Sequence, residues 1–273
     1  MSRLLHSGFV RAWKDPLVRM GMVLMFLLSV FLVGIAYYTK LKEHETIYLD
    51  EIMYLYLPII GIMSAVFCSY LSGQEYCDGA IRNKLVAGHS RVAIYLSDFI
   101  INVSVVLSLV CITFLTEMVL GTLLLDGTQI EFSNIFAVLM GSLLAIIALC
   151  AMFTLISMSG QNHRTSDAIC LLLACILLFV SMYLMLLMVE LNQYDEEKKE
   201  GYEMIITEED ALYPILQNRE IYEFIYDLLP SGQIAQYVSK DVKRPERLPV
   251  CSAGIIIVTT AFGVMLFQRK NIQ

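Results

Sequence analysis

Residues 135–158 read IFAVLMGSLLAIIALCAMFTLISM, a run without a single charged side chain. A hydrocarbon core of about 30 Å needs roughly 20 helical residues at a rise of about 1.5 Å each, so this run is long enough to cross a bilayer. A helix on a soluble protein would show a polar stripe where it meets water, whereas this one is apolar nearly all round. The run therefore predicts a membrane-spanning helix.

Five further apolar runs, one of them shorter, have the same character. Hydrophobic residues make up 58% of the chain and charged residues 16%, against roughly a quarter charged in ordinary soluble domains. The sequence thus predicts an all-α, polytopic membrane protein with six transmembrane helices. The predicted spans are residues 20–38, 52–71, 99–125, 135–158, 168–189 and 250–267.

The basic residues beside the spans predict the orientation, because loops rich in Lys and Arg favour the cytoplasmic side. Ten such residues fall on the side of both termini, against only Lys40 and Lys42 in the short loops opposite. The long segment 190–249 carries little topological weight, although it alone supplies the formal net charge of −7. We expect cytoplasmic N- and C-termini and an external segment at 190–249.

Residues 2–16, ahead of the first span, predict a helix that lies in the membrane interface. On a helical wheel one arc is apolar and includes Trp13, which would sit at headgroup depth. The opposite arc would face the inner-leaflet surface. Its basic residues are Arg3, Arg11 and Lys14. The alternative is an ordinary basic flank to the first span.

The polar loop of residues 72–91 is too long for a simple turn and carries ordered helix signals. Asp78 can cap the start of a short helix, and Gly88 can end it in a left-handed conformation. Ser90 can then cap the next span. The apolar side of the short helix would consist of Ile81, Leu85 and Val86.

Three basic residues of this loop predict a role for the short helix. If the helix lies parallel to the membrane with Arg82, Lys84 and Arg91 exposed, it would dock into a groove on a soluble partner. The alternative is that these charges only fix the topology of the neighbouring spans.

The pattern from Glu75 through Arg91, Glu-x-x-x-Gly-x-Ile-Arg-Asn-Lys-Leu-x-x-Gly-x-Ser-Arg, carries a resemblance to a known family. It is similar to the segment between the second and third spans in permease subunits of the type-2 ABC exporters. The basic interfacial helix, six spans, cytoplasmic termini and large segment before the last span resemble the same family. The resemblance implies a single transmembrane permease domain over residues 1–273.

In that family the loop contains a coupling helix that contacts a cytoplasmic ABC ATPase subunit. The resemblance implies that ATP-driven closure of two ATPase subunits switches a pathway between two permease chains, in a homodimer or a heterodimer. The residues to which it assigns the ATPase contact are Asp78, Ile81, Arg82, Lys84, Leu85, His89 and Arg91.

The energy source must lie in another chain, because the sequence contains no G-x-x-x-x-G-K-[ST] phosphate loop. We expect ATP and Mg to bind to the partner ATPase, and no cofactor, metal or catalytic residue in this chain. A basic surface for nucleic acid is also missing from the sequence. The substrate we favour is an amphipathic peptide or a hydrophobic small molecule. The lack of paired external cysteines favours a bacterial plasma membrane.

Two acidic residues near or within the third span are candidates for function, because buried charge is costly in a membrane. Asp98 would lie at the inner interface. Glu117 either lies near the outer interface or faces a water-accessible pathway as a pathway residue. In the second span, Pro58 with Gly61 would loosen or kink the helix.

The external segment predicts an amphipathic helix over the outer mouth that begins near Pro214. It would shield the bundle, gate release or bind substrate. Pro230 would end the helix, and the family resemblance implies that Leu228 to Gln233 form the turn that leads back to the last span. Its apolar stripe would contain Ile215, Tyr222, Ile225, Leu228 and Leu229.

Two other classes of function compete with transport. A membrane-anchored sensor or immunity protein would bind a peptide or protein through the external segment without a transport cycle. Co-purification of an ATPase subunit would distinguish the transporter from it. An intramembrane hydrolase would need a nucleophile and a base facing each other inside the bundle, and the sequence does not supply that pair.

Overall fold

The computed structural model describes residues 2–44, 46–128, 132–160, 163–199, 218–239, 242 and 244–269. Within these ranges every regular element is helical, which confirms the predicted all-α fold class. Six of the described helices are long and apolar enough to cross a membrane, as predicted. They are α2 (Pro16–Glu43), α3 (Leu57–Cys77), α5 (Arg91–Leu124), α6 (Phe132–Ser159), α7 (His163–Lys199) and α11 (Arg247–Arg269).

Helices α3 and α6 form the centre of the bundle, and α2, α7 and α11 surround them. In the apolar window of α3, 56% of residues are buried, against 17% in α11. Helix α3 packs against α5, α6 and α7, whereas α2 packs mainly against α5 and α11 against α6. The outer helices expose large apolar side chains such as Phe31 and Leu172, which suits contact with lipid.

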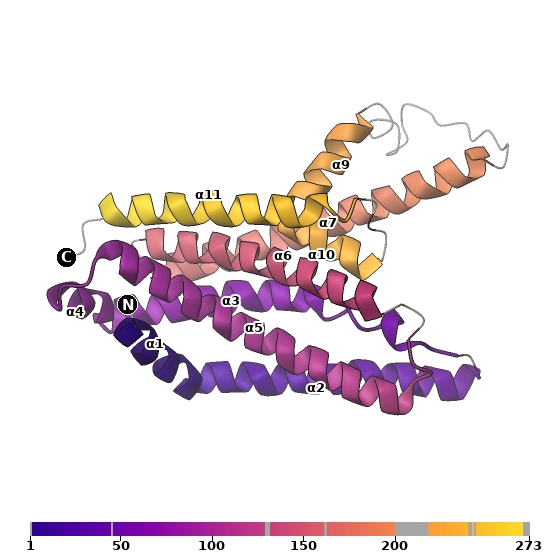
Figure 1. The fold of residues 1–273 in the computed structure, drawn as a ribbon, viewed down its shortest axis with the longest axis horizontal. Helices are drawn as coiled ribbons and strands as arrows, with labels where there is room; N and C mark the ends of the chain where they lie inside the picture. Colours follow the sequence, from indigo (N-terminus) through magenta and orange to yellow (C-terminus); the bar gives the residue numbers. More distant parts are fainter. Residues whose placement is uncertain are drawn as a thin grey trace.

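The short elements gather at the two ends of the bundle (Figure 1). Helix α1 (Ser2–Lys14), helix α4 (Ala80–Val86) and the C-terminal end of α11 share one end. The 3₁₀ helix η1 (Leu49–Glu51) lies toward the opposite end, as do α9 (Arg219–Leu228) and α10 (Pro230–Ser239). An even number of spans requires the start of α1 and the end of α11 to share a side. The assignment of that side to the cytoplasm stays a prediction.

The second span differs from its predicted start at Ile52. Residues after η1 form turns, and α3 begins only at Leu57. Pro58 lies in the first turn of α3, where a backbone donor has no partner within the helix in any case. The predicted kink at Pro58 is therefore wrong, because this proline starts the helix.

The segment before the last span also differs from the prediction. Pro214 and Ile215 lie outside the described residues. The predicted helix is present as α9, which ends at Leu228 before Pro230, and Tyr222 and Leu229 of its stripe pack with buried Tyr226 against α7. Ile225 and Leu228 are each 39% exposed, so they do not complete a buried stripe. Pro230 begins α10 and does not lead directly into the last span, since its fixed φ suits the first turn of a helix.

Candidate functional site

Helix α4 begins because a glycine reverses the chain after α3. Gly79 has φ +64°, and its N–H donates to the carbonyl of Tyr76 at 3.1 Å. Gly79 is the N-cap of α4, and Asp78 belongs to the end of α3 as its C-cap. The predicted cap by Asp78 is therefore wrong, because a left-handed residue is needed between the two helices and glycine adopts that conformation without strain.

The end of α4 follows the prediction closely. Gly88 has φ +85°, and its N–H donates to the carbonyl of Leu85 at 3.0 Å. Ser90 then accepts a hydrogen bond on its side chain from the backbone N–H of Ala93 at 3.3 Å, which caps α5. The short helix predicted within residues 72–91 is thus present as α4.

The inward and outward faces of α4 carry different residues. Ile81 is fully buried in an apolar cluster with residues of α5, α6 and α11, and Leu85 packs against the same cluster. Val86 is 83% exposed, so its predicted place on the apolar side is wrong. Arg82 is exposed as predicted, on a surface that it shares with Val86.

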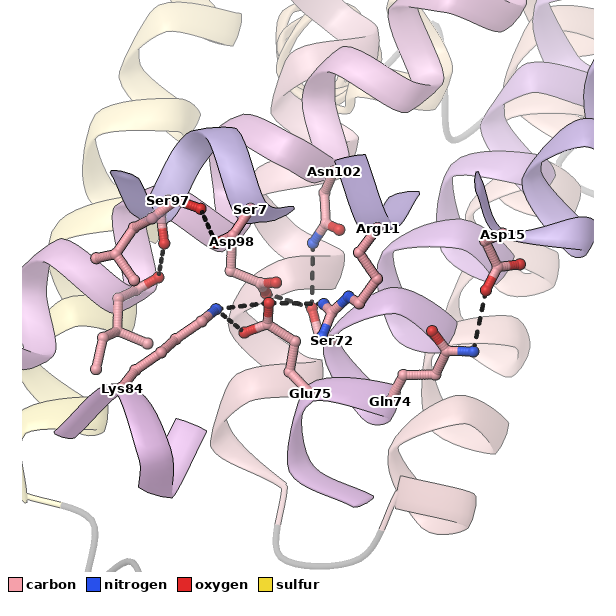
Figure 2. A network of polar contacts seen from close by, with 12 residues as sticks. Ser7, Arg11, Asp15, Ser72, Gln74, Glu75, Lys84, Ser97, Asp98 and Asn102 are labelled. Carbon is pink, nitrogen blue, oxygen red and sulfur yellow. Dashed lines mark hydrogen bonds and ion pairs between the residues drawn. The ribbon is translucent and has the colours of Figure 1, made fainter. Parts of the chain in front are cut away.

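Lys84 turns inward and binds a carboxylate of α3 (Figure 2). Its Nζ lies 2.6 Å from both Oε1 and Oε2 of Glu75, and its side chain is only 14% exposed. The predicted exposure of Lys84 is therefore wrong. The reason is that Glu75 is completely buried and would otherwise hold an uncompensated charge.

A second cation reaches the same carboxylate from α1. The Nη2 of Arg11 lies 2.6 Å from Oε1 of Glu75. Figure 2 places both side chains beside Lys84. Arg11 therefore does not face the leaflet surface as predicted. Glu75 ties α1, α3 and α4 together, and removal of one partner from such a buried ion pair typically costs about 3–5 kcal/mol.

One helical turn further into the bundle, a chain of hydrogen bonds joins α3, α5 and α6. Ser72 donates to Oδ2 of Asp98 at 2.5 Å, and Asn102 donates both to Ser72 and to Thr154 at 3.1 Å. All four side chains are buried. Asp98 is thus part of the packed interior, and its expected depth at the inner interface stays a prediction. We call Glu75, Arg11 and Lys84, together with these four residues, the polar network.

Asp15 connects α2 to the same end of α3. Its Oδ1 accepts from the N–H of Leu17 at 2.8 Å and caps α2, and its Oδ2 accepts from Gln74 at 3.1 Å. The hydroxyl of Tyr70 donates to Oδ2 of Asp15 at 3.3 Å. The start of the first span is therefore held against the helix that carries Glu75.

Arg91 belongs to a different contact from the other basic residues of the loop. It donates to the carbonyls of Phe267 at 3.2 Å and Gln268 at 3.0 Å, in the last turn of α11. A cation is favourable there because the carbonyls at a helix C-terminus carry partial negative charge. The structure therefore separates Arg91 from Arg82, while His89 is partly exposed between them.

Helix α1 packs along α5 as well as reaching Glu75. A Cβ atom on Gly8 would overlap the end of the Ile101 side chain on α5, so a larger residue there would require this side chain to move. Trp13 and Lys14 are exposed on the other face, which suits an interfacial position. The side chain of Arg3 lies outside the described residues.

Glu117 lies far from the polar network, near the other end of α5. It is fully buried, and neither carboxylate oxygen has a hydrogen-bond partner among the described residues. The hydroxyl of Tyr56 is likewise buried and has no hydrogen-bond partner among the described residues. The role of Glu117 as a pathway residue stays a prediction.

Sequence reasoning missed the acceptor at the centre of this arrangement. Glu75 was noted only as the first residue of a motif, and no partner was assigned to it. An acidic residue at the end of an apolar run was the available signal, because such a charge needs a cation nearby. Within the described residues no group of His, Cys, Asp and Glu could hold a metal ion. The contacts of the polar network connect residues of α1, α3, α4, α5 and α6.

One comparison with known proteins identifies a family. The family model described as ABC-2 family transporter protein matches residues 9–181. The match extends from α1 into α7 and contains every residue of the polar network and all of α4. A search of curated proteins found no match.

Proposed function

Because this chain belongs to the ABC-2 family of transporter proteins, we propose that it is the permease subunit of an ATP-driven exporter whose ATPase is a separate polypeptide. The chain is a multi-pass membrane protein and a component of membrane transport. Members of such a family normally work with an ATPase subunit, which supports this kind of partner. ATP and Mg²⁺ would bind to that partner.

The observation that carries the proposal is the construction of α4. This helix lies at one end of the bundle, exposes Arg82 and Val86, and is fixed through Lys84 to Glu75 of α3. A force on its exposed face therefore acts on α3, the most buried span, and does not merely bend a loop. Arg11 extends the same connection to α1.

We assign the partner contact to a smaller set than the sequence suggested. Asp78, Arg82 and Val86 are exposed and would meet the ATPase directly. Ile81, Leu85 and Lys84 would transmit the displacement, because they join α4 to the bundle. Arg91 would keep the end of α11 aligned with α4, and His89 is a further, partly exposed contact.

In the proposed cycle, closure of two ATPase subunits displaces α4 in two permease chains and opens the pathway between them to the other side. The second permease chain is a copy of this one or a related chain. The substrate would be an amphipathic peptide or a hydrophobic small molecule, and the membrane a bacterial plasma membrane. The apolar side chains exposed on α2 and α7 offer surface for the second chain and for lipid.

Reversal of charge at Arg82 tests the partner contact. The chain is expressed with its ATPase subunit, and the ATPase recovered with affinity-tagged permease from detergent-solubilised membranes is measured. Arg82→Glu and Val86→Asp should each weaken this association by roughly tenfold or more, as expected when an interface hot spot is lost. The amount of permease in the membrane should not change, since both side chains are exposed.

Lys42→Glu is the matched control, because Lys42 is also exposed but lies in the last turn of α2, at the other end of that span from α1. It should recover as much ATPase as the unmodified chain. Full recovery of ATPase by both α4 variants would refute the docking role of this helix. Failure of any ATPase to co-purify with the unmodified chain would instead favour a sensor or immunity protein.

A further inference from the structure

A cavity of about 200 Å³ lies inside this subunit, between α3, α6, α7 and α10. It is separate from the polar network, which lies at the other end of α3. Its lining is almost entirely apolar. Residues that line it include Gly61, Leu149, Ala174, Met182, Ser231 and Ala235.

The volume of this cavity is that of a ligand site. Protein interiors are close-packed, and voids larger than a water molecule are few in a domain. An engineered apolar cavity of about 150 Å³ stays free of water and binds benzene. The present cavity is somewhat larger, so it accommodates a segment of several linked carbon atoms.

One polar group in the lining lacks a partner. The hydroxyl of Ser231 is buried and has no hydrogen-bond partner among the described residues. Ser181, the other hydroxyl of the lining, donates to the carbonyl of Leu178 in its own helix at 2.9 Å. A ligand that fits this cavity is therefore apolar along its length and presents one acceptor to Ser231.

The position of the cavity indicates where such a ligand comes from. Pro58 and Gly61 lie in the first two turns of α3, so this side of the cavity is near the end of α3 at which α10 lies, whereas Leu149 and Ala174 line it from within α6 and α7. Ser231 lies in the first turn of α10, so an acyl chain that enters the cavity from the side of α10 would bring its ester group toward this hydroxyl. Met182 lines the cavity and is 56% exposed on the outside of α7, which opens the cavity toward the bilayer.

We propose that this cavity binds an acyl chain of a phospholipid from the leaflet on the side of α10, with the ester carbonyl accepting a hydrogen bond from Ser231. The cavity is smaller than a whole acyl chain, so the chain enters it near the ester and leaves past Met182. Flexible thioether side chains at Met182 and Met185 adapt to a chain that changes shape. A bound lipid would hold α10 against α3 and α7.

The test uses the full chain in nanodiscs that contain phosphatidylcholine with a photoactivatable diazirine close to the ester of one acyl chain. After illumination, mass spectrometry locates the adducts. We expect them on the lining residues of α7 and α10, at a yield well above that on exposed residues of α2. Ala174→Phe fills the cavity and should reduce labelling there to the level of the α2 surface.

Cys175→Phe is the matched control, because Cys175 is the next residue of α7 and is exposed. The yield of adducts on its lining residues should equal that of the unmodified chain. A second variant, Ser231→Ala, keeps the cavity open. It should lower labelling by the ester phospholipid and leave unchanged the labelling by an ether phospholipid, which has no carbonyl to accept a hydrogen bond.

Two results would overturn the proposal. The first is equal labelling of the lining in Ala174→Phe and in the unmodified chain. The second is labelling by a water-soluble photoactivatable methyl ester in the absence of labelling by the phospholipid, which would assign the cavity to a transported compound. Neither result bears on the ATPase contact at Arg82, so the cavity and the proposed transport role are tested separately.

Discussion

Glu75 accepts charge-assisted hydrogen bonds from Arg11 and Lys84, and it is the only one of the three that is completely buried. The two cations have different surroundings, with 31% of the Arg11 side chain exposed but only 14% of Lys84. The carboxylate is therefore the residue on which the contact between α1, α3 and α4 depends. Its loss would leave two cations with no counter-charge in a largely desolvated site.

Glu75→Gln should lower the free energy of unfolding by about 2–3 kcal/mol, because it keeps the shape of the side chain but removes its charge. Unfolding in mixed micelles with increasing SDS would measure the difference. Glu51→Gln is the matched control, since Glu51 is exposed at the other end of the bundle, and it should change stability by less than about 0.5 kcal/mol. Equal stability of the two variants would contradict the importance of the buried charge.

At the scale of elements, α4 depends on the two glycines that bound it. Gly79 and Gly88 both have positive φ, and no atom lies within 4 Å of the position a Cβ would take at either. The constraint at these positions is thus conformational and not steric. Any other residue must adopt a left-handed conformation that costs it about 1–2 kcal/mol.

Gly79→Ala should therefore destabilise the protein by about 1 kcal/mol and increase amide hydrogen exchange within α4. Gly254→Ala is the contrasting variant, because Gly254 lies inside α11 in open space with no positive φ. There alanine should leave stability unchanged or raise it by about 0.5–1 kcal/mol. Hydrogen exchange of α4 by mass spectrometry, with unfolding in parallel, measures both. A change in stability of the same sign in both variants would contradict the role of the positive φ at Gly79.

On the scale of the whole molecule, six spans place α1, α4 and the end of α11 together at one end (Figure 1). Exposed apolar side chains cover the outer helices, whereas the charged groups of the polar network are inside. Cys77 is exposed beside α4 and reports which side of the membrane this end occupies.

A variant that retains only Cys77 should react with a membrane-impermeant maleimide in inverted vesicles and not in intact cells. This outcome follows from the excess of Lys and Arg at that end of the bundle. Permeabilised cells give the control for reactivity, because Cys77 should then be labelled in full. Labelling in intact cells before permeabilisation would reverse the proposed orientation and remove α4 from the reach of a cytoplasmic ATPase.

The sequence alone determined the class of fold and the local form of the loop after the second span. Apolar runs of bilayer length leave the backbone no alternative to helices, because nothing in hydrocarbon can satisfy exposed peptide groups. The roles of Gly88 and Ser90 were equally predictable, because a left-handed helix end and an N-cap depend on residues nearby in the sequence. Asp78 shows the limit of such reading, because a suitable side chain was present but α3 continued to the residue before it.

Only the tertiary structure decided which charges meet and where space remains. Arg11 and Glu75 are 64 positions apart in the chain, and the choice of Glu75 as partner depends on how α1 packs on α5. The inward turn of Lys84 and the exposure of Val86 depend on how α4 packs against α3 and α5. The cavity near Ser231 is likewise formed by helices distant in sequence. Local rules fix a helix and its ends, whereas burial and pairing are set by all neighbours at once.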